Sequence, residues 1–274
     1  MFYVSSIKDN LVGITDTYDN IEEFYSVYDI KEFPSHIKIN GVSSKGIEKI
    51  NLGEAILTRD IVKKIDCKKE LTFEVVNLRD IFKYKLAGYR GITDDFIALE
   101  TDNSIKLLSS RIIKLEGFNG SRGLFESTNF TKIDFHHTNT SNISNMRDMF
   151  RGCRAKYLDL SSFDTSNVEN MMDMFWDCHA KYLDLSSFNT SNVKTMYCMF
   201  KGCHATSLNL SSFNTLNVES MYAMFFSCHA TSLDLSNFDT SNVRNMDDIF
   251  RNYRGTIKSI DDKILRYYSV RRIV

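Results

Sequence analysis

Apolar and polar residues recur together at a fixed interval through the second half of the chain. The recurring positions are 25 residues apart and hold phenylalanine, methionine, asparagine or cysteine. They are Phe150, Phe175, Phe200, Phe225 and Phe250; Met146, Met171, Met196, Met221 and Met246; Asn142, Asn167, Asn192, Asn217 and Asn242; and Cys153, Cys178, Cys203 and Cys228. A constant period of this size is typical of a solenoid, in which each copy is one structural unit stacked on the next.

One copy predicts a strand, a turn and a short helix or 3₁₀ segment, in that order. Leu158 and Leu160 alternate with polar residues, which is the pattern of a strand with one buried face. The residues DTSN that follow are turn formers. Apolar residues at helical spacing come next: Val168, Met171, Met174, Phe175 and Cys178. We therefore expect a parallel sheet on one face, short helices on the other, and copies about 5 Å apart.

The remainder of the chain does not show this period. Residues 1–116 contain strand-like runs between turn formers and predict a β-rich N-terminal region, which two small units could make up. Three glycines in residues 117–123 predict a linker. Five repeats then occupy 124–254, and 255–274 are interpreted as a C-terminal cap, because the open end of a solenoid needs covering. The predicted fold class is α+β, a β-rich domain followed by a solenoid.

Three of the copies carry a family resemblance. LDLSSFDTSNVENMMDMFWDC, LDLSSFNTSNVKTMYCMFKGC and LDLSNFDTSNVRNMDDIF resemble BspA-like leucine-rich repeats, the mycoplasma-lipoprotein type of bacterial surface protein. The resemblance covers about residues 130–254 and implies a leucine-rich-repeat solenoid with a binding role. The chain departs from the family at Ala155, Ala180, Ala205 and Ala230, where a leucine is common, and in showing no export signal.

Composition and charge narrow the function classes. With 34 Lys and Arg against 35 Asp and Glu, the formal net charge is -1, so a general nucleic-acid or anionic-membrane binder is not favoured. No apolar run reaches the roughly 18 residues of a membrane span, and the first residues lack the features of a signal peptide. We therefore expect a cytoplasmic protein with reduced thiols and no membrane partner.

The sequence offers little catalytic or metal-binding chemistry. The GxSxG, HExxH, P-loop and GxGxxG motifs are absent, so we predict no enzyme, no cofactor and no metal. Zinc needs ligands that converge, whereas single cysteines on successive copies form a line, and we interpret them as small buried apolar residues. The recurring asparagines are interpreted as partners of turn backbone groups. A row of histidines, which could alternatively bind a metal or sense pH, follows the cysteines: His179, His204 and His229.

Outward positions of the repeats predict a binding surface. One column reads Arg147, Met172, Tyr197, Tyr222 and Asp247, and another reads Arg151, Trp176, Lys201, Phe226 and Arg251. Both columns are charged at the ends and turn apolar in the middle, as the core of a protein interface does. The predicted partner-binding residues are therefore Met172, Trp176, Tyr197, Tyr222 and Phe226. The alternative is that the N-terminal region or a second copy of the chain covers them.

The strands predict a second, acidic stripe. Asp159, Asp184 and Asp234 recur on the outward side of the predicted strands. They suit a basic partner or a cation, and are included among the predicted partner-binding residues. The alternative is a solvated face in which neighbouring serines donate to the carboxylates: Ser161, Ser186 and Ser211.

The expected function is a protein–protein interaction module that acts by occupying a partner's surface. The sequence does not specify the partner, and self-association stays open. An inhibitor of a host protein, encoded by a phage or mobile element, fits this description. Two alternatives remain: a bacterial surface adhesin, as the resemblance implies, and an enzyme whose site lies in the N-terminal region.

Overall fold

The structure is a computed structural model that describes residues 4–7, 37–39, 42–43, 46–47, 54–76, 90–93, 96–109, 112–118 and 123–270. The chain divides into two compact units. The first consists of residues 1–55, 74–101 and 106–113, and the second of residues 56–73, 102–105 and 114–274. The predicted linker lies mostly outside the described residues, since 119–122 are not among them.

The described part of the first unit is made of short strands. Three pairs are antiparallel: β1 (Val4–Ile7) with β2 (Ile37–Ile39), β3 (Val42–Ser43) with β4 (Gly46–Ile47), and β7 (Arg90–Gly91) with β8 (Ile97–Glu100). Ile97 and Leu108 are buried and pack with Val76 and Leu99. Four strands contribute residues to both units: β5 (Glu54–Leu57), β6 (Glu70–Val75), β9 (Ser104–Ser109) and β10 (Ile112–Leu115).

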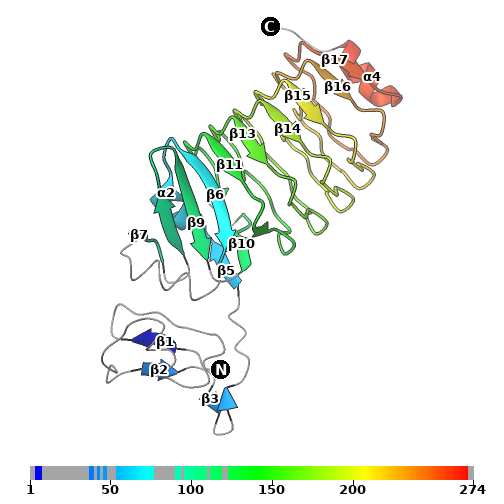
Figure 1. Ribbon diagram of the computed structural model, residues 1–274. Helices are drawn as coiled ribbons and strands as arrows, with labels where there is room; N and C mark the ends of the chain where they lie inside the picture. The colour runs from blue at the N-terminus through cyan, green and yellow to red at the C-terminus, as the bar shows by residue number, and fades with distance from the viewer. Residues whose placement is uncertain are drawn as a thin grey trace. The chain divides into compact units, whose positions relative to one another are not determined.

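A parallel ladder with a 25-residue step dominates the second unit. Its strands, which lie side by side in Figure 1, are β11 (Lys132–Asp134), β13 (Tyr157–Asp159), β14 (Tyr182–Asp184) and β15 (Ser207–Asn209). Leu183 of β14 is in register with Leu208 of β15, so equivalent residues of successive copies meet. Two further strands pair in parallel after them, β16 (Ser232–Asp234) and β17 (Thr256–Lys258). We call each 25-residue copy a coil.

The ladder begins before the first coil that the sequence predicts. The start of β6 pairs in parallel with β11, with Leu71 opposite Ile133. Residues 56–73 accordingly belong to the second unit. The sequence placed this segment in the N-terminal region because it lacks the repeat motif. A short strand β12 (Thr138–Asn139) completes the elements of the first coil.

The predicted short helices are wrong, because the second face of the coils is built from turns. Residues 171–178 form consecutive turns, in which Trp176 N–H donates to the Asp173 carbonyl. Alternate amides instead donate to the next coil, as Asp173 N–H does to Tyr197 O at 2.9 Å. Asp173 and Asp177 have φ values of 58° and 53°, a left-handed conformation that an α-helix cannot contain. We call this surface the turn face.

Stacked apolar columns form the interior between the strands and the turns. Phe175 and Phe200 are parallel with ring centroids 5.6 Å apart, and the same contact recurs along the column. The recurring methionines and cysteines are also buried, as expected for Cys178 and Cys203, which are fully inaccessible. Each apolar residue of a coil is thus covered by the equivalent residues of the two neighbouring coils. Burying this apolar surface stabilises the fold by about 25 cal/mol per Å².

Polar columns satisfy the backbone at the corners of the coils. Asn192 Nδ2 donates to the Ser166 carbonyl at 2.7 Å, and the asparagines at 167, 217 and 242 make the equivalent bond. The structural interpretation is therefore confirmed for these four of the five recurring asparagines. A column of buried threonines also satisfies backbone carbonyls, since Thr190 Oγ1 donates a hydrogen bond to the Asn214 carbonyl at 2.9 Å. This threonine column was not predicted from the sequence.

A helix lies at each end of the coil stack. Helix α2 (Arg59–Ile65) buries Arg59, whose guanidinium donates to the carbonyls of Gly123 and Glu126. At the other end, α4 (Asp262–Ser269) follows β17. The ring of Tyr268 lies edge-on to Phe250, with centroids 5.7 Å apart. These contacts cover the last Phe ring of the column at the position where the sequence predicts a cap.

Candidate functional site

Cations and aromatic rings alternate along one column of the turn face. The Arg151 guanidinium lies 4.0 Å from the ring centroid of Trp176, and Lys201 Nζ lies 4.4 Å from the same centroid. Lys201 also lies 5.2 Å from Phe226, which Arg251 approaches at 5.6 Å. Each ring is half-buried. Cationic side chains therefore lie between the rings of this column as well as at its ends. Each cation–ring contact contributes about 0.5–1 kcal/mol to stability.

A second column of the turn face brings two predicted tyrosines together. The rings of Tyr197 and Tyr222 stack with centroids 4.9 Å apart, and Tyr222 OH donates to Asp248 Oδ2 at 3.5 Å. Met172 is half-buried in the same column. Because this face is built of turns, these side chains meet across coils, and not along a helix as the sequence predicted. All five predicted apolar residues nevertheless lie on one face, partly open to solvent.

Two carboxylates lie beneath these columns. Asp148 is buried and accepts from Arg147 Nε at 3.2 Å and from Arg151 at 3.3 Å. Asp173, one coil further on, is only 4% exposed, and its Oδ1 accepts no hydrogen bond within the described part of the chain. Burial, and then the charge of Asp148, raise the pKa of Asp173 to about 6. Neither residue was assigned a role from the sequence.

The acidic stripe lies on the outward side of the strands, which we call the strand face. Asp159 Oδ1 accepts from the Ser161 amide and hydroxyl, and Asp184 accepts from the Ser186 amide at 3.0 Å. Asp234 makes an ion pair with Lys258 at 2.9 Å. Hydrogen bonds from Ser186 lower the pKa of Asp184. The serines therefore donate as the sequence analysis anticipated, and these carboxylates stabilise the turns that follow the strands.

Two exposed tyrosines on the strand face were missed by the sequence analysis. Tyr157 and Tyr182 are paired residues of β13 and β14 and are 46% and 66% exposed. Together with Asp159 and Asp184 they line a shallow hollow. A detectable signal was present, since tyrosine replaces serine at this strand position in two successive copies. Tyrosine beside carboxylates is a combination suited to basic side chains.

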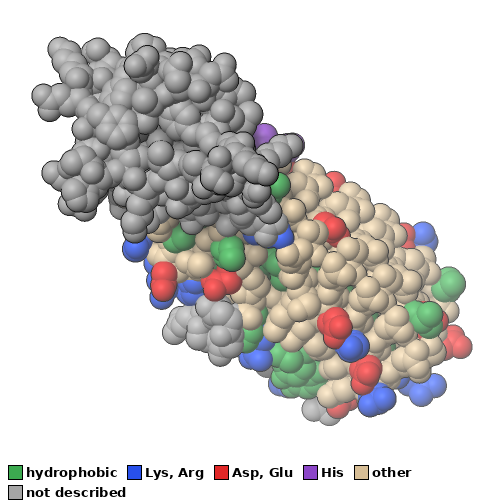
Figure 2. Space-filling model, turned by 90° about the horizontal axis from the view of Figure 1, so that it is seen from below, with side chains coloured by type: hydrophobic (Ala, Val, Ile, Leu, Met, Phe, Trp, Pro, Cys, Tyr) green, Lys and Arg blue, Asp and Glu red, His purple; other side chains and the backbone are tan. Residues whose placement is uncertain are grey.

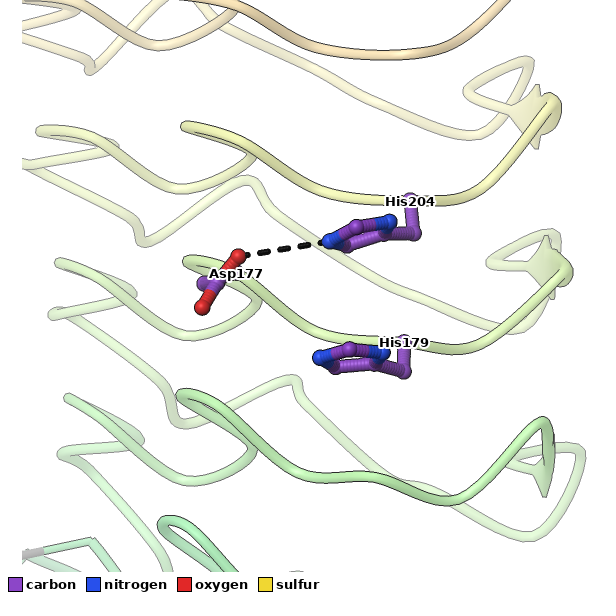
Figure 3. Close-up of side chains that lie close together, drawn as sticks. All are labelled: Asp177, His179 and His204. Carbon is purple, nitrogen blue, oxygen red and sulfur yellow. Dashed lines mark hydrogen bonds and ion pairs between the residues drawn. The ribbon is translucent and has the colours of Figure 1, made fainter.

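The histidine row lies at the corner between the turn face and the next strand. His179 and His204 stack with centroids 4.4 Å apart, and His204 stacks on His229 at 4.8 Å. His204 Nε2 lies 3.3 Å from Asp177 Oδ1, as Figure 3 shows. Burial, and then the charge of His204, lower the pKa of His179. This arrangement combines imidazole and carboxylate groups from two neighbouring coils.

Comparison with known proteins places the coils in a family. A family model described as "Mycoplasma protein of unknown function, DUF285" matches residues 120–232 and 183–264, together just over half of the chain. The chain belongs to this family. No curated protein and no solved structure matches it. The DUF285 matches include both candidate faces and the histidine row, and they end within α4.

The surface of this DUF285 protein carries both signs of charge. On the face in Figure 2, basic and acidic side chains are interspersed among backbone and uncharged polar side chains. No helix in the described ranges is long and apolar enough to span a membrane. The mixed charge suits contacts of specific geometry more than a general attraction to polyanions.

Proposed function

We propose that the chain is a protein-binding module whose contact surface is the turn face. The observation that supports this is the column in which Arg151, Lys201 and Arg251 alternate with Trp176 and Phe226. Tryptophan, tyrosine and arginine are the residue types that contribute most to binding at protein interfaces. Here they are held in fixed positions by the coils, so little conformational entropy is lost when a partner binds.

The chemistry of the turn face indicates the kind of partner. Its aromatic rings offer apolar contact area, and its guanidinium and ammonium groups are donors without acceptor capacity. A partner that presents carboxylates beside aliphatic or aromatic side chains complements both.

The strand face has the opposite character, because Tyr157 and Tyr182 lie beside Asp159 and Asp184. It is the second candidate surface, for a partner rich in lysine and arginine.

The experiment is a pull-down from source-cell lysate followed by binding measurements with the purified partner. Trp176→Glu is the test variant, because a carboxylate at this position removes the ring and pairs with Arg151 and Lys201. Tyr182→Glu is the matched control on the strand face. We expect a partner whose affinity falls at least about tenfold with Trp176→Glu and is unchanged with Tyr182→Glu. The opposite order would assign binding to the strand face and reject the turn face.

The fold class and compartment of the module complete the proposal. We propose that the coils form a leucine-rich-repeat solenoid of the BspA-like type, which the 25-residue parallel register supports. The six cysteines form no disulfide, which supports a reducing compartment and a cytoplasmic location. A cell-surface fraction containing the protein would instead favour the adhesin alternative.

A further inference from the structure

We propose that Asp177, His179 and His204 form a binding site for a divalent transition metal ion, with zinc as the best fit. The site goes beyond the proposed binding function and involves none of the residues assigned to it. One carboxylate oxygen and two imidazole nitrogens, one from each residue, all lie within 4.8 Å of one another. Figure 3 shows the two rings side by side, with His204 directed at Asp177.

The donor set selects the class of metal. Imidazole nitrogen with carboxylate oxygen suits zinc and the neighbouring divalent metals such as cobalt, nickel and copper, whereas magnesium and calcium prefer oxygen ligands alone. One pair of donors is already at a separation that two ligands of one zinc ion can have, since the His204 Nε2 and Asp177 Oδ1 atoms are 3.3 Å apart. The rings of His179 and His204 stack 13° from parallel, so the His179 ring must rotate before the nitrogens of both rings point to one ion.

The backbone holds these three residues in place before a metal arrives. Asp177 N–H donates to Lys201 O at 2.8 Å, and His204 N–H donates to Cys178 O at 2.9 Å, so both coils are tied together at the site. His179 N–H is fixed in the same way on the preceding coil. A site built on paired coils loses little entropy when its ligands converge, and this favours tight binding.

The neighbouring positions leave space for an ion. The residue that follows Asp177 by one coil is Gly202, and a Cβ there would come within 3.8 Å of Asp177 Oδ1. This distance is an ordinary van der Waals contact, so position 202 does not crowd the carboxylate. The side chains of Asp177 and His204 are 61% and 34% exposed, so an ion can enter from solvent. With three protein ligands, a fourth position remains for water or a partner's side chain.

Two other groups of donors are weaker candidates. Asp134, His136 and Asp159 also lie close together, but both carboxylates there already accept from the residues two positions ahead. The thiols of Cys178 and Cys203 are fully buried, and burial raises the pKa of both, so they do not supply thiolates to an exposed ion.

The test is metal titration of the full chain, reduced and freed of metal. Zinc alone is added in competition with a chromophoric chelator, and cobalt alone is added as a spectroscopic probe. Asp177→Asn is the test variant, because asparagine keeps the shape of the side chain and tolerates the positive φ of 53° at this position. His204→Gln removes a nitrogen ligand. His229→Gln is the matched control, because this ring belongs to the same row but not to the group of three.

We expect one zinc ion to bind per chain and to raise the unfolding temperature. Asp177→Asn and His204→Gln should each weaken zinc binding at least about tenfold and abolish that rise, since even changes to residues behind metal ligands cost this much. His229→Gln should stay within about threefold of the unaltered chain. The proposal is overturned if no saturable binding occurs, if Asp177→Asn binds zinc as tightly as the unaltered chain, or if cobalt shows sulfur-to-metal charge-transfer absorption. The unfolding temperatures without metal show whether each variant is folded.

Discussion

The carboxylate of Asp261 accepts two hydrogen bonds from Thr240, one from its amide at 3.0 Å and one from its hydroxyl at 2.7 Å. In earlier coils the equivalent threonine hydroxyl donates to a carbonyl of the next coil, as Thr215 does to Asp239 O. No further coil follows Thr240, and a side chain takes that carbonyl's place. The same carboxylate accepts from Ile264 N–H at 2.9 Å and so caps the start of α4. One residue thus closes the stack and begins the helix that covers it.

We expect Asp261→Ala to lower the free energy of unfolding by about 2 kcal/mol, because it removes a helix N-cap and leaves the buried Thr240 donors unpaired. Urea unfolding measures the loss. Asp261→Asn, which keeps an acceptor oxygen, should lose less than half as much. A loss below about 0.5 kcal/mol for the alanine variant would contradict the role of this carboxylate.

The pH dependence of stability should report on Asp173. Its pKa is raised to about 6, so the folded protein favours the protonated form. The stability that this group provides is therefore fully present below its ordinary pKa of 3.8 and is lost as the pH rises through about 6. The loss amounts to at most about 3 kcal/mol, since one pKa unit corresponds to about 1.4 kcal/mol.

Asp173→Asn should remove that dependence. Asparagine has the same shape, carries no charge and tolerates the φ of 58° at this position. We expect the variant to be more stable than the unaltered chain at pH 8 and of similar stability at pH 4, as measured by urea unfolding at both pH values. Equal stability of the two proteins at pH 8 would show that the ionised carboxylate is not destabilising.

Gly202 should be required for its backbone conformation and not for lack of space. Its φ is 61°, and an added Cβ would meet no atom closer than 3.8 Å. We therefore expect Gly202→Ala to lower the free energy of unfolding by about 1 kcal/mol, the penalty for a left-handed alanine.

Ser227 occupies the equivalent position one coil later with a φ of 50°. Ser227→Gly should raise the unfolding temperature, and a fall there would indicate that the serine side chain matters more than the strain.

Thiol labelling should separate the cysteines into two groups. Burial raises the pKa of Cys198 and Cys228 to about 11, and Cys153, Cys178 and Cys203 are fully inaccessible. Cys67 is only partly buried. Under native conditions we expect a maleimide to modify Cys67 alone and all six thiols after unfolding, as counted by mass spectrometry. Rapid modification of Cys178 in the folded protein would contradict the sealed interior.

The sequence was sufficient to predict the strands and their register, because Leu158 and Leu183 recur in phase with every other column. It could not distinguish a short helix from a row of turns. Buried residues such as Met171, Met174 and Cys178 are spaced three or four apart in both structures. The difference lies in where the amides donate, and residue types such as Cys198 give no sign of a positive φ. The start of the ladder at β6 was missed because Leu71 lies outside the repeat motif.

The surface residues were harder to predict than the interior. Trp176 and Tyr222 were correctly grouped with the outward columns, since the repeat itself reveals which positions vary. The insertion of Lys201 between two rings depends on the distance between coils, which only the structure gives. The approach of Asp177 to His204 likewise joins residues 27 positions apart through a turn whose shape the sequence does not specify.

The 25-residue register has a consequence for how such a gene can change. Tyr182 pairs with Ser207 and Leu183 with Leu208, so the columns of these coils join residues one full copy apart. Duplication or deletion of a whole copy leaves all other pairs intact, whereas a frame-preserving change of any other length alters the spacing inside one coil and must be absorbed there as a bulge or loop. The molecule can therefore lengthen or shorten by recombination between its own copies, in steps of about 4.8 Å, while both end helices are kept.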